Sequence, residues 1–257
     1  MTTTLQTMSD CEISWPSRPA GIGPSDGVAH IWAACLDVPE SELRDFADVL
    51  APDEKARASR FRFDIHRNRF IAGRGLLRTI LGQYLEVAAR NIQFGYGKNG
   101  KPFLSGKGES LEFNLAHSEH LALITVCTGG EIGVDVERVR ILDDFDELVA
   151  RFFSQRETRE FRQLGIEEQP NAFFNLWTRK EAWLKATGEG IVHSLKHVEV
   201  SFLPEERARF LSLPTEAGET SNWRLHELLP SPGFVGALAT SAGVSRVECW
   251  SWGEKRL

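Results

Sequence analysis

Two short segments carry carboxylates and an ammonium group at spacings that suit chemistry on a phosphate. In the run WTRKEAWLKATGEGI, Glu181 and Lys185 are four residues apart, so in a helix both point to one face. In the run IGVDVE, Asp135 and Glu137 alternate with valines, so in a strand both point to one side. Three carboxylates beside a lysine predict a site for Mg²⁺ and a phosphate ester, because Mg²⁺ binds through a few carboxylates plus substrate phosphates.

Each pair also has a plainer interpretation. A D-x-E pair alone favours the solvated face of a strand, and a Glu–Lys pair at this spacing is often a surface ion pair worth roughly a few tenths of a kcal/mol. The flanking residues weaken both interpretations. Ile132 and the valines indicate a buried strand, in which adjacent carboxylates repel unless a cation lies between them. Trp177 and Leu184 share the face of Glu181, and an exposed helix face seldom carries both.

The other candidate motifs are fully explained by local structure. The run GYGKNGKP lacks the Walker spacing of a P-loop, and Asn99-Gly100 within it predicts a tight hairpin turn. His117 and His120 have no partners at transition-metal spacing, and no Ser-His-Asp arrangement can be assigned.

Composition and charge indicate a globular protein that binds one anionic ligand. The chain is 42% hydrophobic and 26% charged, which is ordinary for a domain with a core. Its net charge is −6, yet residues 55–78 contain eight basic side chains and one acidic one. A basic patch on an acidic protein favours an anionic ligand over nucleic acid, since no nucleic-acid motif accompanies it. The nearby Phe61, Phe63 and Phe70 are expected in the core.

The cysteines and the N-terminus indicate where the chain works. The four cysteines are widely scattered, with no C-x-x-C pair, which fits a reducing cytosol better than a disulfide scaffold or a zinc site. Residues 1–27 contain no long apolar run and no basic start, so we expect a flexible tail rather than a signal peptide or a membrane span. A cytoplasmic protein is therefore predicted.

Hydrophobic periodicity predicts an α+β fold of two similar halves. We expect halves at 28–130 and 131–257, with a junction near Gly129-Gly130. Helices are expected at 41–50, 53–63, 65–85, 144–153, 155–164 and 171–187, the last capped by Gly188. Strands are expected at 28–37, 111–115, 121–127, 132–139, 198–202, 223–229, 234–240 and 247–252, with a hairpin over 96–104.

Taken in order, the motifs resemble those of the Sfp-type (surfactin-synthetase-type) 4′-phosphopantetheinyl transferases. They are KxR at 55–57, NRF at 68–70, GKP at 100–102, FNLAHS at 113–118, GVDVE at 133–137, RFFSQRE at 151–157 and WTRKEAWLKATGEG at 177–190. Any one of them is weak. GVDVE followed at this distance by W-x-x-K-E-A-x-x-K is highly specific.

This resemblance implies a pseudo-dimer of two α+β halves with coenzyme A in the cleft between them. The implied reaction transfers 4′-phosphopantetheine from coenzyme A to a serine hydroxyl of an apo acyl or peptidyl carrier protein, with Mg²⁺, and releases 3′,5′-ADP. Asp135, Glu137 and Glu181 would hold Mg²⁺ against the pyrophosphate. Glu181, or a water that it orients, would act as the general base, and Lys185 would neutralise or protonate the leaving phosphate.

Six further positions are implied as contacts for coenzyme A: Lys55, Arg57, Arg69 and His117 at the 3′-phosphate region, and Lys101 and Pro102 at the adenine. Two departures from the family pattern fall here. Ala116 stands where a serine often precedes the histidine, and Phe70 replaces a small hydroxyl residue after Arg69. Glu157 matches a family acid near the site, but a charge at a helix N-terminus explains it equally well.

Two rival functions are also consistent with these residues. A magnesium-dependent hydrolase of nucleotide pyrophosphates could use the same carboxylates, and a non-catalytic module could bind coenzyme A or a carrier protein. The resemblance favours the transferase. Because the chain already holds two halves, we expect a monomer.

Overall fold

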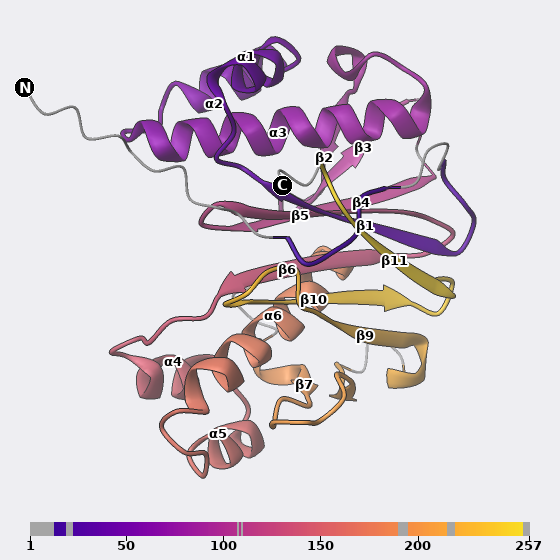
Figure 1. Ribbon diagram of the computed structural model, residues 1–257. Coiled ribbons are helices and arrows are strands. Elements are labelled where there is room, and N and C mark those ends of the chain that lie inside the picture. Colours follow the sequence, from indigo (N-terminus) through magenta and orange to yellow (C-terminus); the bar gives the residue numbers. More distant parts are fainter. Residues whose placement is uncertain are drawn as a thin grey trace, which may run out of the picture.

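The chain folds into two α+β halves that stack sheet against sheet (Figure 1). The computed structural model describes residues 13–18, 23–106, 108, 110–189, 195–214 and 219–253. One sheet has the strand order β11-β1-β5-β4 and the other β6-β10-β9. Helix α3 covers the outer face of the first sheet, and helix α6 covers the outer face of the second. The α+β fold class expected from periodicity is confirmed.

The first half contains the elements β1 (Val28–Cys35), α1 (Glu40–Asp48), α2 (Pro52–Ala58), α3 (Asp64–Leu85), η1 (Ala89–Asn91), β2 (Phe94–Tyr96), β3 (Pro102–Leu104), β4 (Leu111–Ser118) and β5 (Leu121–Thr128). The second contains β6 (Ile132–Arg138), α4 (Phe145–Phe152), α5 (Gln155–Phe161), α6 (Gln169–Thr187), η2 (Leu195–His197), β7 (Glu199–Val200), β8 (Phe210–Ser212), η4 (Thr220–Asn222), β9 (Trp223–Leu228), β10 (Phe234–Ser241) and β11 (Arg246–Ser251).

The two halves repeat one topology. In each, a strand leads to a long helix, then to a two-stranded ribbon (β2–β3 or β7–β8), then to two more strands. The first strand pairs with the last and the last with the middle one, giving β1-β5-β4 and β6-β10-β9. This shared order supports the pseudo-dimer layout, although no sequence repeat accompanies it.

The chain termini cross between the halves. Strand β11 pairs in parallel with β1, so the half expected over 131–257 contributes its final strand to the first sheet. Within the expected tail, Ser17 forms a bridge with Ser251, and the Ser14 N–H donates to the Pro230 carbonyl. The described part of that tail is therefore bound to both halves.

Three apolar clusters hold the four layers together. On β1, Trp32 belongs to the cluster under α3, whereas its neighbour Ile31 belongs to the cluster between the sheets. A strand buried on both faces needs such a continuous apolar run. On β6, Val134 and Val136 enter the same inter-sheet cluster, so the alternation turns Gly133 and Asp135 towards α6.

One expected helix and one expected core residue differ in the structure. Helix α2 ends at Ala58 instead of residue 63, because the N–H groups of Arg60 and Phe61 donate to carbonyls three residues back instead of four. The side chain of Phe63 is 57% exposed, so its expected place in the core was wrong. Gly188 ends α6 with φ +73°, as predicted. In the part of the chain that the structure describes, no helix is long and apolar enough to cross a bilayer.

Gly133 lets α6 approach β6 closely, and this contact is testable. A Cβ at Gly133 would overlap the Ala182 carbonyl and the Ala186 backbone. We expect Gly133→Ala to destabilise the fold by about 3 kcal/mol or more, because neither backbone can move aside. Chemical denaturation checks this. Gly73→Ala is the matched control, since its nearest neighbour is 3.7 Å away and helix propensity favours alanine by up to about 1 kcal/mol. Equal stability of both variants would contradict the packing argument.

Candidate active site

Helix α6 and strand β6 bring the predicted carboxylates and lysine together. Lys185 Nζ donates to Asp135 Oδ1 at 2.6 Å, and the charges of Asp135 and Glu137 act on Glu181. The close approach at Gly133 places the last turns of α6 directly over this strand. The i,i+4 pair Glu181 and Lys185 therefore does not form a surface ion pair, because Lys185 binds a carboxylate on the strand instead.

Two carboxylate oxygens at this site are buried without a hydrogen-bond partner among the described residues. They are Asp135 Oδ2 and Glu181 Oε1. Burial raises the pKa of Asp135 to about 6, against the opposing charge of Lys185. Burial, and then the charge of Asp135, raise the pKa of Glu181 to about 7. Lys185 compensates the charge of Asp135 only through Oδ1, and no cation pairs with Glu181 among the described residues, although a full negative charge is costly in a buried place.

Glu137 is held by the edge strand of the first half. Ser118 Oγ donates to Glu137 Oε2 at 2.7 Å and accepts from the Arg138 N–H at 3.1 Å. Further along β4, Asn114 Oδ1 accepts from the Val134 N–H at 3.1 Å. These side-chain oxygens accept from backbone N–H groups on the edge of β6 that does not pair with β10. They also fix the register of the two halves across the site. Asn114 and Ser118 belong to the FNLAHS motif, but the motif alone did not predict that they bind β6.

The donor set fits a hard divalent cation, although the side chains are not gathered around one point. Asp135, Glu137 and Glu181 offer only oxygen ligands, and two of those oxygens have no other partner. Oxygen donors of this type suit Mg²⁺. Across the described ranges, no group of three or more His, Cys, Asp or Glu side chains is close enough for metal ligation. In this arrangement Lys185 supplies the positive charge beside Asp135.

A positive region adjoins the carboxylates. Although its ring is exposed to solvent, His117 has a lowered pKa, first through desolvation and then through the charges of Lys185, Arg69 and His66. Charges from α6 and α3 therefore act on His117 of β4. Lys185 contributes to both the acidic and the basic part of the site.

Fewer basic side chains of the segment 55–78 are available to bind a ligand than its charge count indicates. Arg69 forms a two-pronged pair with Asp37, at 2.7 and 2.8 Å, and this hydrogen bonding raises its pKa. Arg74 and Arg78 both bind Glu54, a buried acid that precedes the counted segment by one residue. With Arg67, which lies 3.0 Å from Asp64, four of the eight basic side chains therefore pair with acids of the first half.

Lys55 and Arg57 remain exposed on α2. Arg57 lies over the ring of Phe70, 5.2 Å from its centroid. Phe70, which departs from the family pattern, thus gives Arg57 a cation–π contact. It does not contact Arg69 in this way, because Arg69 is directed at Asp37.

The β2–β3 hairpin reaches across to the end of α6. Lys101 Nζ donates to the Ala186 carbonyl at 2.7 Å, and Asn99 Nδ2 donates to the Gly188 carbonyl at 3.0 Å. Both bonds satisfy carbonyls that a helix leaves unpaired at its C-terminus, where a cation is favoured. Lys101 therefore joins the two halves and also lies 3.6 Å from Glu112.

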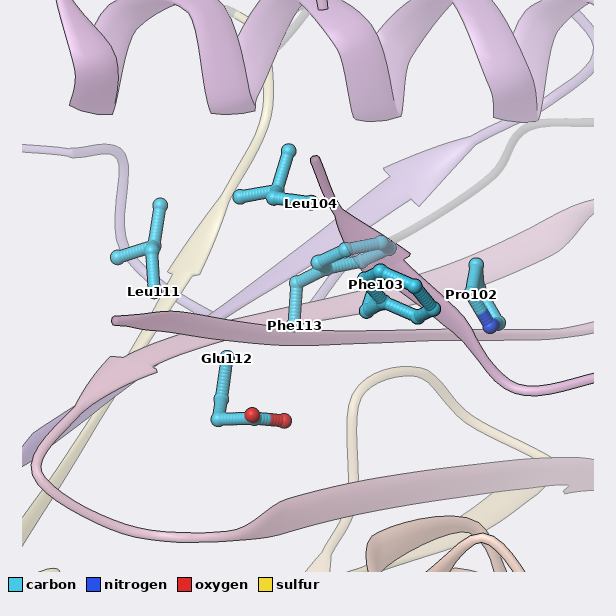
Figure 2. A pocket seen from close by; sticks show the side chains of 6 residues that line it. All are labelled: Pro102, Phe103, Leu104, Leu111, Glu112 and Phe113. Atoms are coloured by element: carbon cyan, nitrogen blue, oxygen red, sulfur yellow. The ribbon is translucent and has the colours of Figure 1, made fainter. Parts of the chain in front are cut away.

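A small cavity of about 270 Å³ lies beside this hairpin, between β3 and β4. Figure 2 shows the side chains that line it: Pro102, Phe103, Leu104, Leu111, Glu112 and Phe113. Leu104 and Leu111 point towards α3, whereas Glu112 points away from it. The volume is near the lower limit for a ligand pocket, so it has room for only part of a nucleotide.

Comparison with known proteins identifies the family. Residues 131–239 match the 4′-phosphopantetheinyl transferase superfamily, and residues 37–128 match the N-terminal region of a 4′-phosphopantetheinyl transferase. The chain is 41% identical over 241 residues to the 4′-phosphopantetheinyl transferase HetI of Nostoc sp., covering 93% of this chain and 98% of that protein. The chain belongs to the 4′-phosphopantetheinyl transferase family.

Two Bacillus proteins are also similar. The 4′-phosphopantetheinyl transferase psf-1 of Bacillus pumilus is 33% identical over 67% of this chain and 72% of its own length. The 4′-phosphopantetheinyl transferase Sfp of Bacillus subtilis is 26% identical over 63% of this chain and 71% of its own length. The resemblance to Sfp-type enzymes drawn from the motifs is therefore confirmed.

The raised pKa of Glu181 predicts a gain in stability when its charge is removed. The folded protein holds this proton more tightly than the unfolded chain does, so stability falls as the pH rises from about 4.5 through about 7. At pH 8 with EDTA, we expect Glu181→Gln to raise the free energy of unfolding by roughly 1–3 kcal/mol. Denaturant titration at pH 8 and at pH 5 checks this.

Glu137→Gln is the matched control, because Glu137 already accepts from Ser118 and lies 3.7 Å from Arg140. It should not gain stability at pH 8. If Glu181→Gln were no more stable than the wild type at pH 8, the carboxylate would already have a compensating partner.

Proposed function

We propose that this protein transfers the 4′-phosphopantetheine group of coenzyme A to a serine hydroxyl of an apo acyl or peptidyl carrier protein, releasing 3′,5′-ADP. The observation that carries the proposal is the buried carboxylate of Glu181, which has an unpartnered oxygen beside the Asp135–Lys185 pair. Membership of the transferase family defines the class of reaction that this site would catalyse.

In this reaction the serine oxygen forms a bond to the phosphorus next to pantetheine, and the bond from that phosphorus to 3′,5′-ADP breaks. Asp135, Glu137 and Glu181 would hold Mg²⁺, which would stabilise the charge of the pyrophosphate. Glu181, or a water that it orients, takes the serine proton. Lys185 would neutralise or protonate the phosphate that leaves.

Coenzyme A would lie along the line where the two halves meet. The charges of Lys185 and Arg69 act on His117, so we place the 3′-phosphate region beside these groups, with Lys55 and Arg57 as exposed cations of α2. Lys101 and Pro102 would border the adenine, and the cavity lined by Pro102 and Phe103 is the nearest concave surface. Arg69 can contribute its charge while it stays bound to Asp37.

We further propose that the protein acts in the cytoplasm as a monomer. No disulfide joins the cysteines of the described segments, as expected in a reducing compartment. One chain supplies both sides of the site, with His117 and Lys101 from the first half and the carboxylates from the second. A second copy is therefore not needed to complete it.

The direct test is an intact-mass assay with purified protein, coenzyme A, Mg²⁺ and a panel of apo carrier proteins. We expect at least one carrier to gain a single phosphopantetheine arm, and we expect EDTA or Glu181→Ala to abolish the gain. Cleavage of coenzyme A without any mass gain would instead favour a hydrolase of nucleotide pyrophosphates. Neither gain nor cleavage, with coenzyme A still bound, would favour a binding module.

Substitution of Lys185 separates binding from turnover. We expect Lys185→Met to lower kcat by about 10²-fold or more, because the charge on the leaving phosphate loses its neutralising partner. The affinity for coenzyme A should change far less. Steady-state kinetics and calorimetric titration with coenzyme A check this. A variant that binds coenzyme A poorly but turns over normally would assign Lys185 to binding alone.

A further inference from the structure

Glu157 and Lys180 form an ion pair that is completely buried within the second half. Both side chains are 0% exposed, and Lys180 Nζ donates to Glu157 Oε2 at 2.5 Å. The same ammonium donates to the Leu195 carbonyl at 2.9 Å and lies 5.3 Å from the ring centroid of Phe153. Lysine is almost never buried to this extent without such compensation.

The Glu157 carboxylate joins three segments at this point. Its Oε2 accepts from the Ser154 N–H at 2.9 Å, which completes a capping box at the start of α5. Its Oε1 accepts from the Val200 N–H of β7 at 3.1 Å. With Lys180 of α6, the carboxylate therefore connects a helix start, a strand and the middle of the long helix. It points into the core of the second half and makes no contact with the cleft through these bonds.

Lys180 directly precedes Glu181, and the residue before it is anchored as well. Arg179 Nη1 donates to the Ser201 carbonyl at 2.5 Å, and Arg179 Nη2 donates to Glu227 Oε1 at 2.9 Å. Successive helix residues point about 100° apart around the axis. Two anchors in consecutive directions fix how α6 is rotated, and that rotation sets where Glu181 points.

We propose that Glu157 and Lys180 are positioning residues: their buried ion pair fixes the rotation of α6 and thereby holds Glu181 against Asp135 on β6. The proposal rests on the proposed function, because Glu181 acts on substrate only in that reaction. A side chain about 5–6 Å from the helix axis moves by about 1 Å for a 10° rotation. A misplacement of about 1 Å can lower the rate by about 10²-fold.

Stability alone is a weak reason for such a pair. Replacement of a buried ion pair by apolar side chains of similar volume is often neutral or stabilising. A charged pair, however, donates and accepts hydrogen bonds only in specific directions. Apolar packing does not impose such directions. The pair is thus better suited to fixing an orientation than to adding free energy of folding.

The test compares the double variant Glu157→Met/Lys180→Met with the wild type. It removes both charges together, so neither is left buried and unpaired. We expect it to fold with a lower thermal midpoint, because the Ser154 and Val200 N–H groups lose their acceptor, and we expect kcat of the folded variant to fall by about 10- to 100-fold. KM for coenzyme A should change by no more than about threefold, since its proposed contacts lie elsewhere. Calorimetric titration with Mg²⁺ in the presence of coenzyme A should show about tenfold weaker binding.

Arg156→Gln is the matched control. Arg156 also lies on α5 and pairs with Glu160 and Glu199, but it does not touch α6 through these pairs. It should keep the kcat and the Mg²⁺ affinity of the wild type. If the double variant does not fold, Glu157→Gln/Lys180→Met takes its place, because it also removes both charges and the glutamine keeps the shape of the side chain and part of the capping box.

Native kcat and native Mg²⁺ affinity in a folded variant that lacks the pair would overturn the proposal. Assay of the wild type with carrier proteins distinguishes a failure of this positioning role from a failure of the proposed transferase function. If the wild type modifies no carrier, the proposed function fails, and the Mg²⁺ titration still reports whether the pair positions Glu181.

Discussion

Buried charge along α6 must be compensated residue by residue, and this requirement shapes the second half. Over residues 178–184 the helix is buried on every side, so water cannot solvate its polar groups. Arg179 and Lys180 find carboxylates and carbonyls within their own half. Glu181 Oε1, like the indole Nε1 of Trp183, has no hydrogen-bond partner among the described residues. The contrast between the compensated charges of Arg179 and Lys180 and the uncompensated carboxylate distinguishes Glu181 from its charged neighbours on the helix.

The site exists only where the two halves meet. The second half supplies the carboxylates and Lys185, whereas the first supplies His117 and the side chains that complete the edge of β6, Asn114 and Ser118. Lys101 and Asn99 cross in the same direction to the end of α6. Polar bonds of this kind require a defined geometry. The contacts that join the halves therefore also set the relative positions of the reacting groups.

Local periodicity was enough to predict most of the elements and the side chains that α6 and β6 bring together. The i,i+4 spacing placed Glu181 and Lys185 on one face of α6, and alternation placed Asp135 on the side of β6 that faces this helix. Partners distant in sequence could not be found in this way. Asp37 lies 32 residues from Arg69, and β11 joins a strand from the opposite end of the chain. Neither pairing produces a local pattern.

The number of positive charges in the first half is a poor guide to the positive potential at the site. Arg69, Arg74 and Arg78 are neutralised by Asp37 and Glu54, so their charges act mainly on the packing of α3. Lys185 differs from these arginines: it pairs with Asp135, yet its charge still lowers the pKa of His117. Any second cation that binds Asp135 would weaken its attraction for Lys185. Lys185 would then be available to a phosphate beside His117, and this exchange electrostatically couples the two parts of the site.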